Sequence, residues 1–207
     1  MLPLPTDSAT RTIAFPPPEF ITVVTGYPRS GTSLMMQMLA AGGMPVLVDG
    51  VKKPNEHNPR GYYEFERALK LGGEGETTDW VADAPGKAVK IIAYQLKHLP
   101  ATHHYWAIFM RRRIQEVLAS SRKMCMLKEN SNLSEREQIL AFKTEYVIYE
   151  VQLQRQANFA TLFVNYNDLL TDPHPPLMRV RDFLGVPLDL DAMTAAIDPA
   201  LYRNRNG

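Results

Sequence analysis

The sequence contains very little of several features that would place a protein in a class at once. Cys125 is the only cysteine among 207 residues, so no disulfide can form within the chain, which suits a reducing cytoplasm. The formal net charge is +1, which excludes a strong overall field toward nucleic acid or a membrane surface. No stretch of about 18 apolar residues occurs, so no transmembrane helix is expected. We therefore expect a cytoplasmic protein that acts on a small molecule, with neither nucleic acid nor a membrane as its partner.

Two common kinds of active site are also absent from the sequence. The five histidines and Cys125 have no spacing typical of metal ligands, so no metal site is expected. No G-x-S-x-G sequence occurs, which excludes the nucleophile turn of serine hydrolases. Residues 1–19 lack the apolar core of a secretory signal and carry five prolines, which predicts an N-terminal tail.

Residues 20–39 form the most informative segment that is present. They read FITVVTGYPRSGTSLMMQML, in which an apolar β-branched run, a loop bounded by Gly26 and Gly31, and an apolar helical pattern follow one another. Such a loop directs successive backbone N–H groups and the positive end of the helix dipole to one point, which favours an anion. The two glycines allow a tight turn and a close approach to the ligand. The segment therefore predicts a phosphate cradle.

The cation of this loop is not where a nucleotide hydrolase has it. The Walker A pattern G-x-x-x-x-G-K-[ST] places a lysine after the second glycine, whereas Thr32 follows Gly31 here. Arg29 lies inside the loop instead, where its forked guanidinium can contact anionic oxygens. The pattern predicts an anion site but argues against ordinary nucleoside triphosphate chemistry.

Apolar runs and helical patterns alternate along the rest of the chain. The run YWAIFM at residues 105–110 is apolar on both faces, as in a sheet that helices cover on both sides. We therefore predict an α/β fold, with a single three-layer domain over residues 20–207 and a mainly parallel sheet. Strands are expected at residues 20–26, 46–48, 88–92, 105–110 and 161–166. Helices are expected at residues 31–41, 62–71 and 114–124, from a capping box at residues 134–137, and from residue 175 to Gly185.

A second anion site is predicted where the strand at residues 105–110 ends. Three arginines follow that strand, and side chains alternate across a strand, so Arg112 faces opposite to its neighbours. Ligands of open parallel sheets gather beyond the carboxyl ends of the strands, which places Arg112 near the cradle. Ser120 follows two helical turns later. Arg112 and Ser120 could hold a second phosphate, so a ligand with two separated anionic groups is expected.

These two segments resemble the motifs of sulfotransferases that use 3′-phosphoadenosine 5′-phosphosulfate (PAPS). Residues 26–33, GYPRSGTS, resemble the family pattern G-x-P-[KR]-S-G-T-[TS], which holds the 5′-phosphosulfate. Residues 112–120, RRIQEVLAS, resemble R-[DN]-P-x-[DE]-V-x-x-S, which holds the 3′-phosphate. In the second motif Arg113 and Ile114 replace the acid or amide and the proline.

Further resemblances point to the bacterial branch of the family. Residues 58–64, NPRGYYE, are similar to its N-P-x-G-[YFW]-[FW]-E element. Residues 165–185 are similar to its Y-E-D-L-x-x-D-P…F-L-G stretch, with Asn167 in place of the usual Glu. The basic, glycine-containing segment of the cytosolic animal enzymes has no counterpart, and Arg203 and Arg205 are candidates to replace it.

The resemblance implies transfer of a sulfuryl group from PAPS to a hydroxyl or amine of a small or medium-sized acceptor. The product would be 3′,5′-diphosphoadenosine (PAP), and no metal would be required. Because the fold resembles that of P-loop proteins, the cradle loop is expected to bind the nucleotide. The expected cofactor-binding residues are Arg29, Ser30, Gly31, Thr32, Ser33, Arg112 and Ser120.

Three residues are expected to act on the reacting groups. Arg29 would neutralise charge on the bridging oxygen as the bond to sulfur breaks, since most of the help in such transfers is electrostatic. Glu64 is the first candidate for the general base, and His57 is the second. Lys90 lies within a predicted strand, where a lysine is unusual, and could reach the sulfo group or simply extend to solvent.

Two other functions fit the same residues. In a P-loop kinase, the run at residues 46–48 would be a strand and Asp49 would hold magnesium, although Thr32 stands where the kinase needs lysine. In a non-catalytic nucleotide-binding protein, the altered second motif would still serve binding on the same fold. Residues 44–86 and 124–134 are expected to shape the acceptor pocket, and the oligomeric state is left open.

Overall fold

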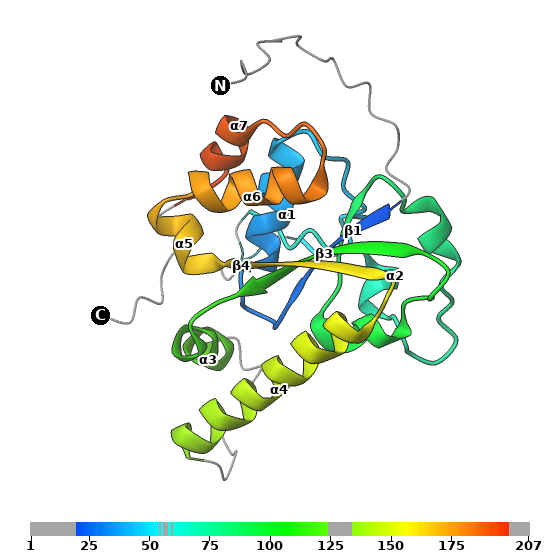
Figure 1. The fold of residues 1–207 in the computed structure, drawn as a ribbon. Coiled ribbons are helices and arrows are strands. Elements are labelled where there is room, and N and C mark those ends of the chain that lie inside the picture. The colour runs from blue at the N-terminus through cyan, green and yellow to red at the C-terminus, as the bar shows by residue number, and fades with distance from the viewer. Residues whose placement is uncertain (1–19, 54, 56–57, 59, 124–133, 199–207) are drawn as a thin grey trace, which may run out of the picture.

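The protein, described here from a computed structural model, is built on one four-stranded parallel sheet (Figure 1). The structure describes residues 20–53, 55, 58, 60–123 and 134–198. The strands are β1 (Phe20–Gly26), β2 (Ala88–Lys90), β3 (His104–Arg111) and β4 (Phe159–Asn165), and their order in the sheet is β2-β1-β3-β4. The cradle strand β1 is therefore an inner strand, with β3 as its neighbour.

The register brings the carboxyl ends of the strands to one edge. Gly26 at the end of β1 is paired with Met110, one residue before the end of β3. Arg111 is in turn paired with Asn165, the last residue of β4. Lys90, the last residue of β2, is paired with Val24 of β1. Because the pairing is parallel throughout, the segments that follow all four strands share this edge.

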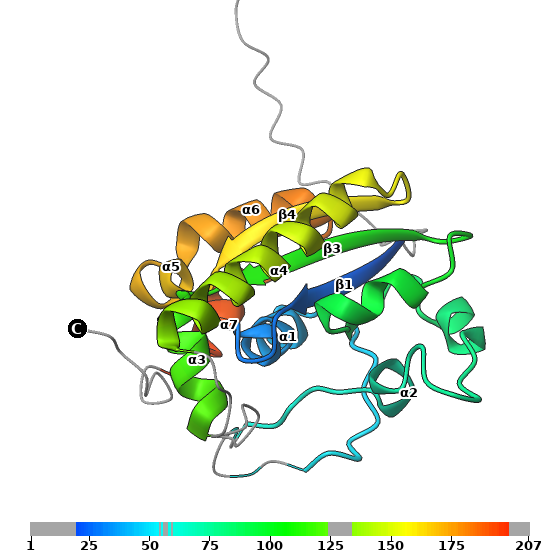
Figure 2. The same cartoon turned by 90° about the horizontal axis from the view of Figure 1, so that it is seen from below.

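Helices cover both faces of the sheet (Figure 1; Figure 2). One face packs against α1 (Thr32–Ala41), α6 (His174–Leu184) and α7 (Leu190–Ala195), with α5 (Tyr166–Thr171) leading into them. The other face packs against α4 (Glu135–Arg155), the short helix α2 (Glu66–Leu69) and two 3-10 helices, η1 (Asp79–Asp83) and η2 (Ala93–His98). Helix α3 (Ile114–Lys123) follows β3 and contacts α4. The result is a three-layer α/β domain.

Strands β1 and β3 supply both hydrophobic cores because their side chains alternate between the two faces. Val24 and Ile108 join the core under α1, which also contains Met35, Met38 and Met110, all fully buried. The core on the other face takes Val23 and Phe109 instead. The continuous apolar character of residues 105–110 thus reflects a strand buried on both sides.

The predicted fold class is confirmed, and most elements lie where the sequence placed them. The capping box at Ser134 and Glu137 is formed, and Gly185 ends α6 with a φ of 64°. Two predictions are wrong. Residues 46–48 are not a strand, since only Val46 makes an isolated bridge to Ala88, and residues 62–71 are helical only over α2. Helices α5 and α7 were not predicted. None of the helices in the described ranges is long and apolar enough to cross a membrane.

Candidate active site

The loop between β1 and α1 turns through three residues with positive φ. Gly26 has a φ of 143°, and a Cβ there would lie 2.6 Å from both the Met110 carbonyl oxygen and Ser30 Oγ, so only glycine fits. Arg29 has a φ of 72°, which is uncommon for a residue with a side chain, and Gly31 has a φ of 100° at the N-cap of α1. This backbone aims the loop and the start of α1 at one point, as an anion cradle requires.

Ser30 supports the assignment of an anion site to this loop. Its side chain is fully buried, and its Oγ has no hydrogen-bond partner among the described residues. A buried hydroxyl without a partner costs about 1 to 3 kcal/mol, so such groups in native structures call for an explanation. A ligand oxygen bound in the cradle would supply the missing partner.

The two predicted anion sites meet at Arg29. Its Nε donates a hydrogen bond to Ser120 Oγ at 2.8 Å, although the two residues are 91 positions apart in the chain. Arg112 donates from a terminal guanidinium nitrogen to the backbone oxygen of Arg29 at 3.2 Å. Burial lowers the pKa of Arg29 from its usual value, and the nearby Arg112 adds to that effect. Two cations and the buried Ser120 hydroxyl therefore lie side by side, an arrangement that suits an anionic ligand.

Arg112 is held by a buried network at the start of α3. Its Nε donates to Glu116 Oε2 at 2.9 Å, and the side chains of Arg112 and Glu116 are 8% and 0% exposed. The other Glu116 oxygen accepts a hydrogen bond from Asn167 Nδ2 at 3.0 Å. Asn167 Oδ1 accepts one from the backbone N–H of Arg113 at 3.3 Å. This network fixes the direction of the Arg112 guanidinium.

The ring of Tyr166, the first residue of α5, packs against both the cradle loop and Arg112. A Cβ on Gly31 would come within 2.3 Å of the ring, so the cradle backbone packs directly against it. The Arg112 guanidinium carbon lies 4.4 Å from the centre of the same ring, in a cation–π contact. Tyr166 therefore contacts both predicted anion sites.

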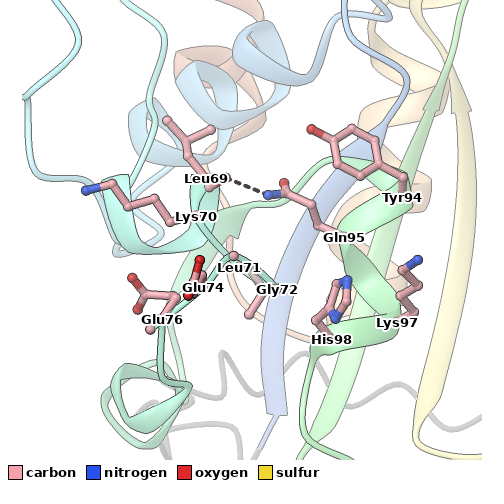
Figure 3. A pocket seen from close by; sticks show the side chains of 12 residues that line it. Leu69, Lys70, Leu71, Gly72, Glu74, Glu76, Tyr94, Gln95, Lys97 and His98 are labelled. Atoms are coloured by element: carbon pink, nitrogen blue, oxygen red, sulfur yellow. Dashed lines mark hydrogen bonds between the residues drawn. The ribbon is translucent and has the colours of Figure 1, made fainter.

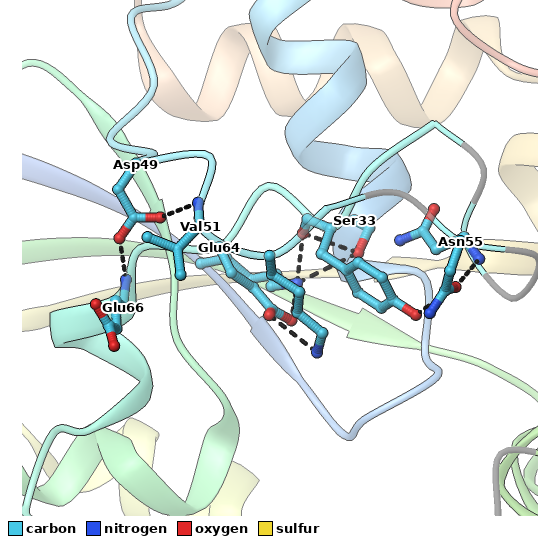
Figure 4. Close-up of polar contacts among 10 residues, drawn as sticks. Ser33, Asp49, Val51, Asn55, Glu64 and Glu66 are labelled. Carbon is cyan, nitrogen blue, oxygen red and sulfur yellow. Dashed lines mark hydrogen bonds and ion pairs between the residues drawn. The ribbon is translucent and has the colours of Figure 1, made fainter.

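Lys90 and Glu64 meet on the other side of the cradle, in the region that Figure 4 shows. Lys90 Nζ lies 2.8 Å from Glu64 Oε1 and 3.3 Å from Ser33 Oγ, and it also donates to the backbone oxygen of Tyr62. The side chains of Lys90 and Glu64 are 3% and 9% exposed. Lys52 pairs with the second Glu64 oxygen at 3.0 Å. Ser33 thus links the cradle to a buried ion pair.

The buried environment of Lys90 lowers the pKa of its ammonium group. Burial lowers the pKa of Lys90 to about 8, and the adjacent Glu64 carboxylate opposes part of that shift. Close to neutral pH, the group is an ammonium within reach of Ser33. All three of its protons have acceptors, namely Glu64, Tyr62 and Ser33, so binding to a ligand would require one of these to be released.

Asp49 does not play the part that the kinase hypothesis gives it. Its carboxylate accepts hydrogen bonds from the backbone N–H groups of Val51 and Glu66 (Figure 4), and no strand ends at this residue. It therefore caps the start of α2. The second base candidate, His57, lies outside the described residues, as do residues 124–133 of the expected acceptor region and both Arg203 and Arg205.

A pocket of about 600 Å³ lies between the segment that follows α2 and the 3-10 helix η2 (Figure 3). Leu69 and Glu76 line it on one side, and Tyr94 and His98 on the other. It overlaps the expected acceptor region at residues 69–76. None of the residues predicted to bind the cofactor lines this pocket.

Comparison with known proteins gives a result for the fold. No protein-family model and no curated protein sequence matches the chain. Among solved structures, the sulfotransferase domain of the Synechococcus olefin synthase is similar, with a TM-score of 0.51 and 19% identity over 91% of this chain and 89% of that one. The sulfotransferase STF1 of Mycobacterium tuberculosis gives a TM-score of 0.56 and 17% identity over 89% of this chain and 73% of that one. The chain has a sulfotransferase fold.

The sequence did not predict the roles of several residues in this site. Glu116 was noted only as a matching position, yet it holds Arg112. Tyr166 was predicted to end a strand and Asn167 was assigned to no element, whereas both lie in α5 against the site. The signal for Asn167 was its departure from the family pattern, because an amide can donate to Glu116 and accept from a backbone N–H at once. No sequence signal points to the role of Tyr166.

Proposed function

We propose that the protein is a PAPS-dependent sulfotransferase that transfers a sulfuryl group to a hydroxyl or amine of a small or medium-sized acceptor. The observation that carries the proposal is the contact between the two anion sites, with Arg29 bonded to Ser120 at 2.8 Å and Arg112 bonded to the Arg29 backbone. PAPS carries two anionic groups on one nucleoside. A cradle next to a second fixed cation matches that distribution of charge.

The residues of the cradle would hold the 5′-phosphosulfate. Backbone N–H groups at Gly31, Thr32 and Ser33 lie at the N-terminus of α1, where the helix dipole favours an anion. Ser30 would offer its buried Oγ, and Arg29 would stabilise negative charge on the oxygen that bridges phosphorus and sulfur. Arg112 and Ser120 would bind the 3′-phosphate as two donors of fixed geometry.

PAPS supplies the sulfuryl group, whose bond to the bridging oxygen breaks as sulfur bonds to the acceptor oxygen or nitrogen. Lys90 would place its ammonium toward the sulfo oxygens when Ser33 releases it, since that contact is the longest of the three at 3.3 Å. Glu64 would accept the acceptor's proton on Oε2, which requires Lys52 to move away. The Lys52 side chain is 47% exposed, and this movement would also give up its cation–π contact with the Tyr62 ring, 4.1 Å away.

The proposal is tested by the thermal unfolding of the protein with PAP in the absence of metal. A ligand at about a hundred times its Kd adds about 2.7 kcal/mol to the stability of the folded state. For a chain of this size, the unfolding midpoint should rise by about 5 to 10 °C. Arg29→Ala and Arg112→Ala should each reduce the shift. Arg113→Ala is the matched control, because that side chain is 63% exposed and lies next to Arg112.

Three outcomes would contradict the proposal or narrow it. A shift seen only with Mg-ATP would favour the kinase alternative, and no shift with either ligand would overturn nucleotide binding altogether. Transfer is measured separately, with sulfur-labelled PAPS and a panel of phenols, alcohols and amines. Binding of PAP without transfer to any member of the panel would favour the non-catalytic nucleotide-binding protein.

A further inference from the structure

Helix α4 carries an apolar stripe on its outer side. Leu140, Val147, Ile148 and Val151 are 64%, 59%, 46% and 36% exposed, and they are four of the nine large hydrophobic side chains found exposed among the described residues. At 100° per residue, these four positions fall within about 100° of the helix circumference. They therefore lie on one side of the helix, together with the exposed Thr144, and we call these four side chains the outer stripe.

The opposite side of α4 is already occupied. Tyr146 and Leu153 are buried in the core beneath the helix, and Phe142, Tyr146 and Tyr149 all pack against Tyr27 of the cradle loop, with ring centres 4.7 to 5.9 Å apart. In Figure 2, α4 lies in front of β3 and β4, with its outer side toward the viewer. The helix is thus apolar on two faces, of which the residues that the structure describes cover only the inner face.

The charges beside the outer stripe form a self-complementary pattern. Glu137 and Arg155 lie at the two ends of the stripe, and Lys143 and Glu150 flank it on one side. If a second copy of α4 packs antiparallel with its centre near residue 146, Glu137 meets Arg155 of that copy and Lys143 meets its Glu150. In the same register, Leu140 meets the region of Val151. Each contact occurs twice, as a two-fold axis demands.

We infer that the protein forms a homodimer in which the outer stripes of two α4 helices pack antiparallel across a two-fold axis. Helix α4 carries four glutamates and three basic residues, whereas helices that lie on membranes are rich in lysine and arginine on their polar face. Glu150 already bonds to Arg111 at 2.7 Å, so the partner's Lys143 would join an existing ion pair at the rim of the interface.

The expected dimer is of moderate strength. Helix α4 has 21 residues and is about 31 Å long, so a contact along it is at the small end of specific interfaces. We expect a dissociation constant in the micromolar range. Tyr27 of the cradle loop packs against the inner face of α4, so a dimer that restrains α4 would also restrain the cradle loop.

The inference is tested by sedimentation velocity of the full chain from about 1 to 200 µM. The protein should pass from monomer to dimer, and Val147→Glu should raise the dissociation constant at least about a hundredfold by placing two carboxylates in one apolar contact. Met178→Glu on α6 is the control, since Met178 is also exposed, at 38%. A protein that stays monomeric at 200 µM, or a dimer unchanged by Val147→Glu, would overturn the inference.

The direction of packing is tested by cross-linking in a Cys125→Ser background. Val147→Cys lies near the proposed axis and should form a disulfide with its own counterpart under mild oxidation, because the two Cα atoms come within bonding range. Leu140→Cys should not, since its two copies would be about 18 Å apart along the helices. Self-cross-linking of both variants would mean parallel packing and would rule out the antiparallel dimer. PAP binding is measured on each variant independently, so failure of the dimer is distinct from failure of the sulfotransferase proposal.

Discussion

The two cation–carboxylate pairs of the site are built in different ways. Arg112 and Glu116 are four residues apart at the end of β3 and the start of α3, so the pair forms within one local segment. Lys90 and Glu64 are 26 residues apart, and Glu64 comes from a segment that has little regular structure before α2. The geometry of the first pair is therefore determined by one local segment. The geometry of the second pair depends on how the long segment before α2 packs against β2.

The difference bears on how motifs should be read. The RRIQEVLAS segment departs from its family pattern at two positions, yet it forms a closed network through Glu116 and Asn167. The NPRGYYE segment agrees better with its pattern, yet it is held by Lys52, Lys90 and the contact of Arg60 with the Ala196 backbone. Agreement with a motif therefore does not decide whether the contacts of a segment are local or long-range.

Breaking the Arg112 pair should have the largest effect on stability. Glu116→Ala leaves the buried Arg112 without its carboxylate, and loss of one partner of a buried pair costs about 3 to 5 kcal/mol. Urea denaturation measures the change. Arg113→Ala, at an exposed side chain, should stay within about 0.5 kcal/mol. Equal stability of the two variants would show that the network does not support the fold.

The Lys90 pair should respond to pH, with a smaller effect. Because burial lowers the pKa of Lys90 to about 8, transfer activity that needs the ammonium should fall about tenfold per pH unit above that value. Lys90→Arg keeps its charge and should move this decline to higher pH. A decline at the same pH in the variant would exclude Lys90 as the titrating group.

Stability should change in the opposite direction over the same range. The folded protein gives up the Lys90 proton near pH 8, whereas the unfolded chain keeps it to about 10.5, so the unfolded state binds more protons between these values. The free energy of unfolding contributed by this group therefore rises from pH 8 to about 10.5. Loss of activity with rising stability separates deprotonation of Lys90 from unfolding.

The smallest effect on stability is expected at Lys52, the most exposed member of the Lys90–Glu64 cluster. Its side chain is 47% exposed and makes an ion pair with Glu64 and a cation–π contact with Tyr62, so Lys52→Ala should lower the free energy of unfolding by no more than about 2 kcal/mol. The same variant should change the rate of transfer at a fixed pH, since Glu64 Oε2 loses its ion pair with Lys52. An unchanged rate would indicate that Lys52 plays no part near Glu64.

The sequence was sufficient for those parts of the fold that local patterns determine. The run at residues 105–110, the capping box and the cradle glycines each specify their own geometry, and all were predicted. The predicted strand at residues 46–48 was wrong because a short apolar run has no local feature that separates a strand from an extended loop. Pairing with a neighbouring strand makes the difference, and of these residues only Val46 forms a bridge, to Ala88.

Within the site, the sequence could name residues but not the contacts between them. The hydrogen bond from Arg29 to Ser120 joins positions 91 apart, and the place of Tyr166 depends on α5, whose six residues are too few for a helical period to show. The pairing of Lys90 with Glu64 likewise follows from tertiary packing.

Tyr166 has one further consequence. Its ring packs against Gly31 and carries the Arg112 guanidinium, so in the proposed nucleotide site it would help to fix the distance between the two bound phosphates. A ligand would then be selected by the distance between its charges as much as by their number. Isomers that carry the second phosphate on a different hydroxyl of the ribose would present the same total charge at the wrong interval.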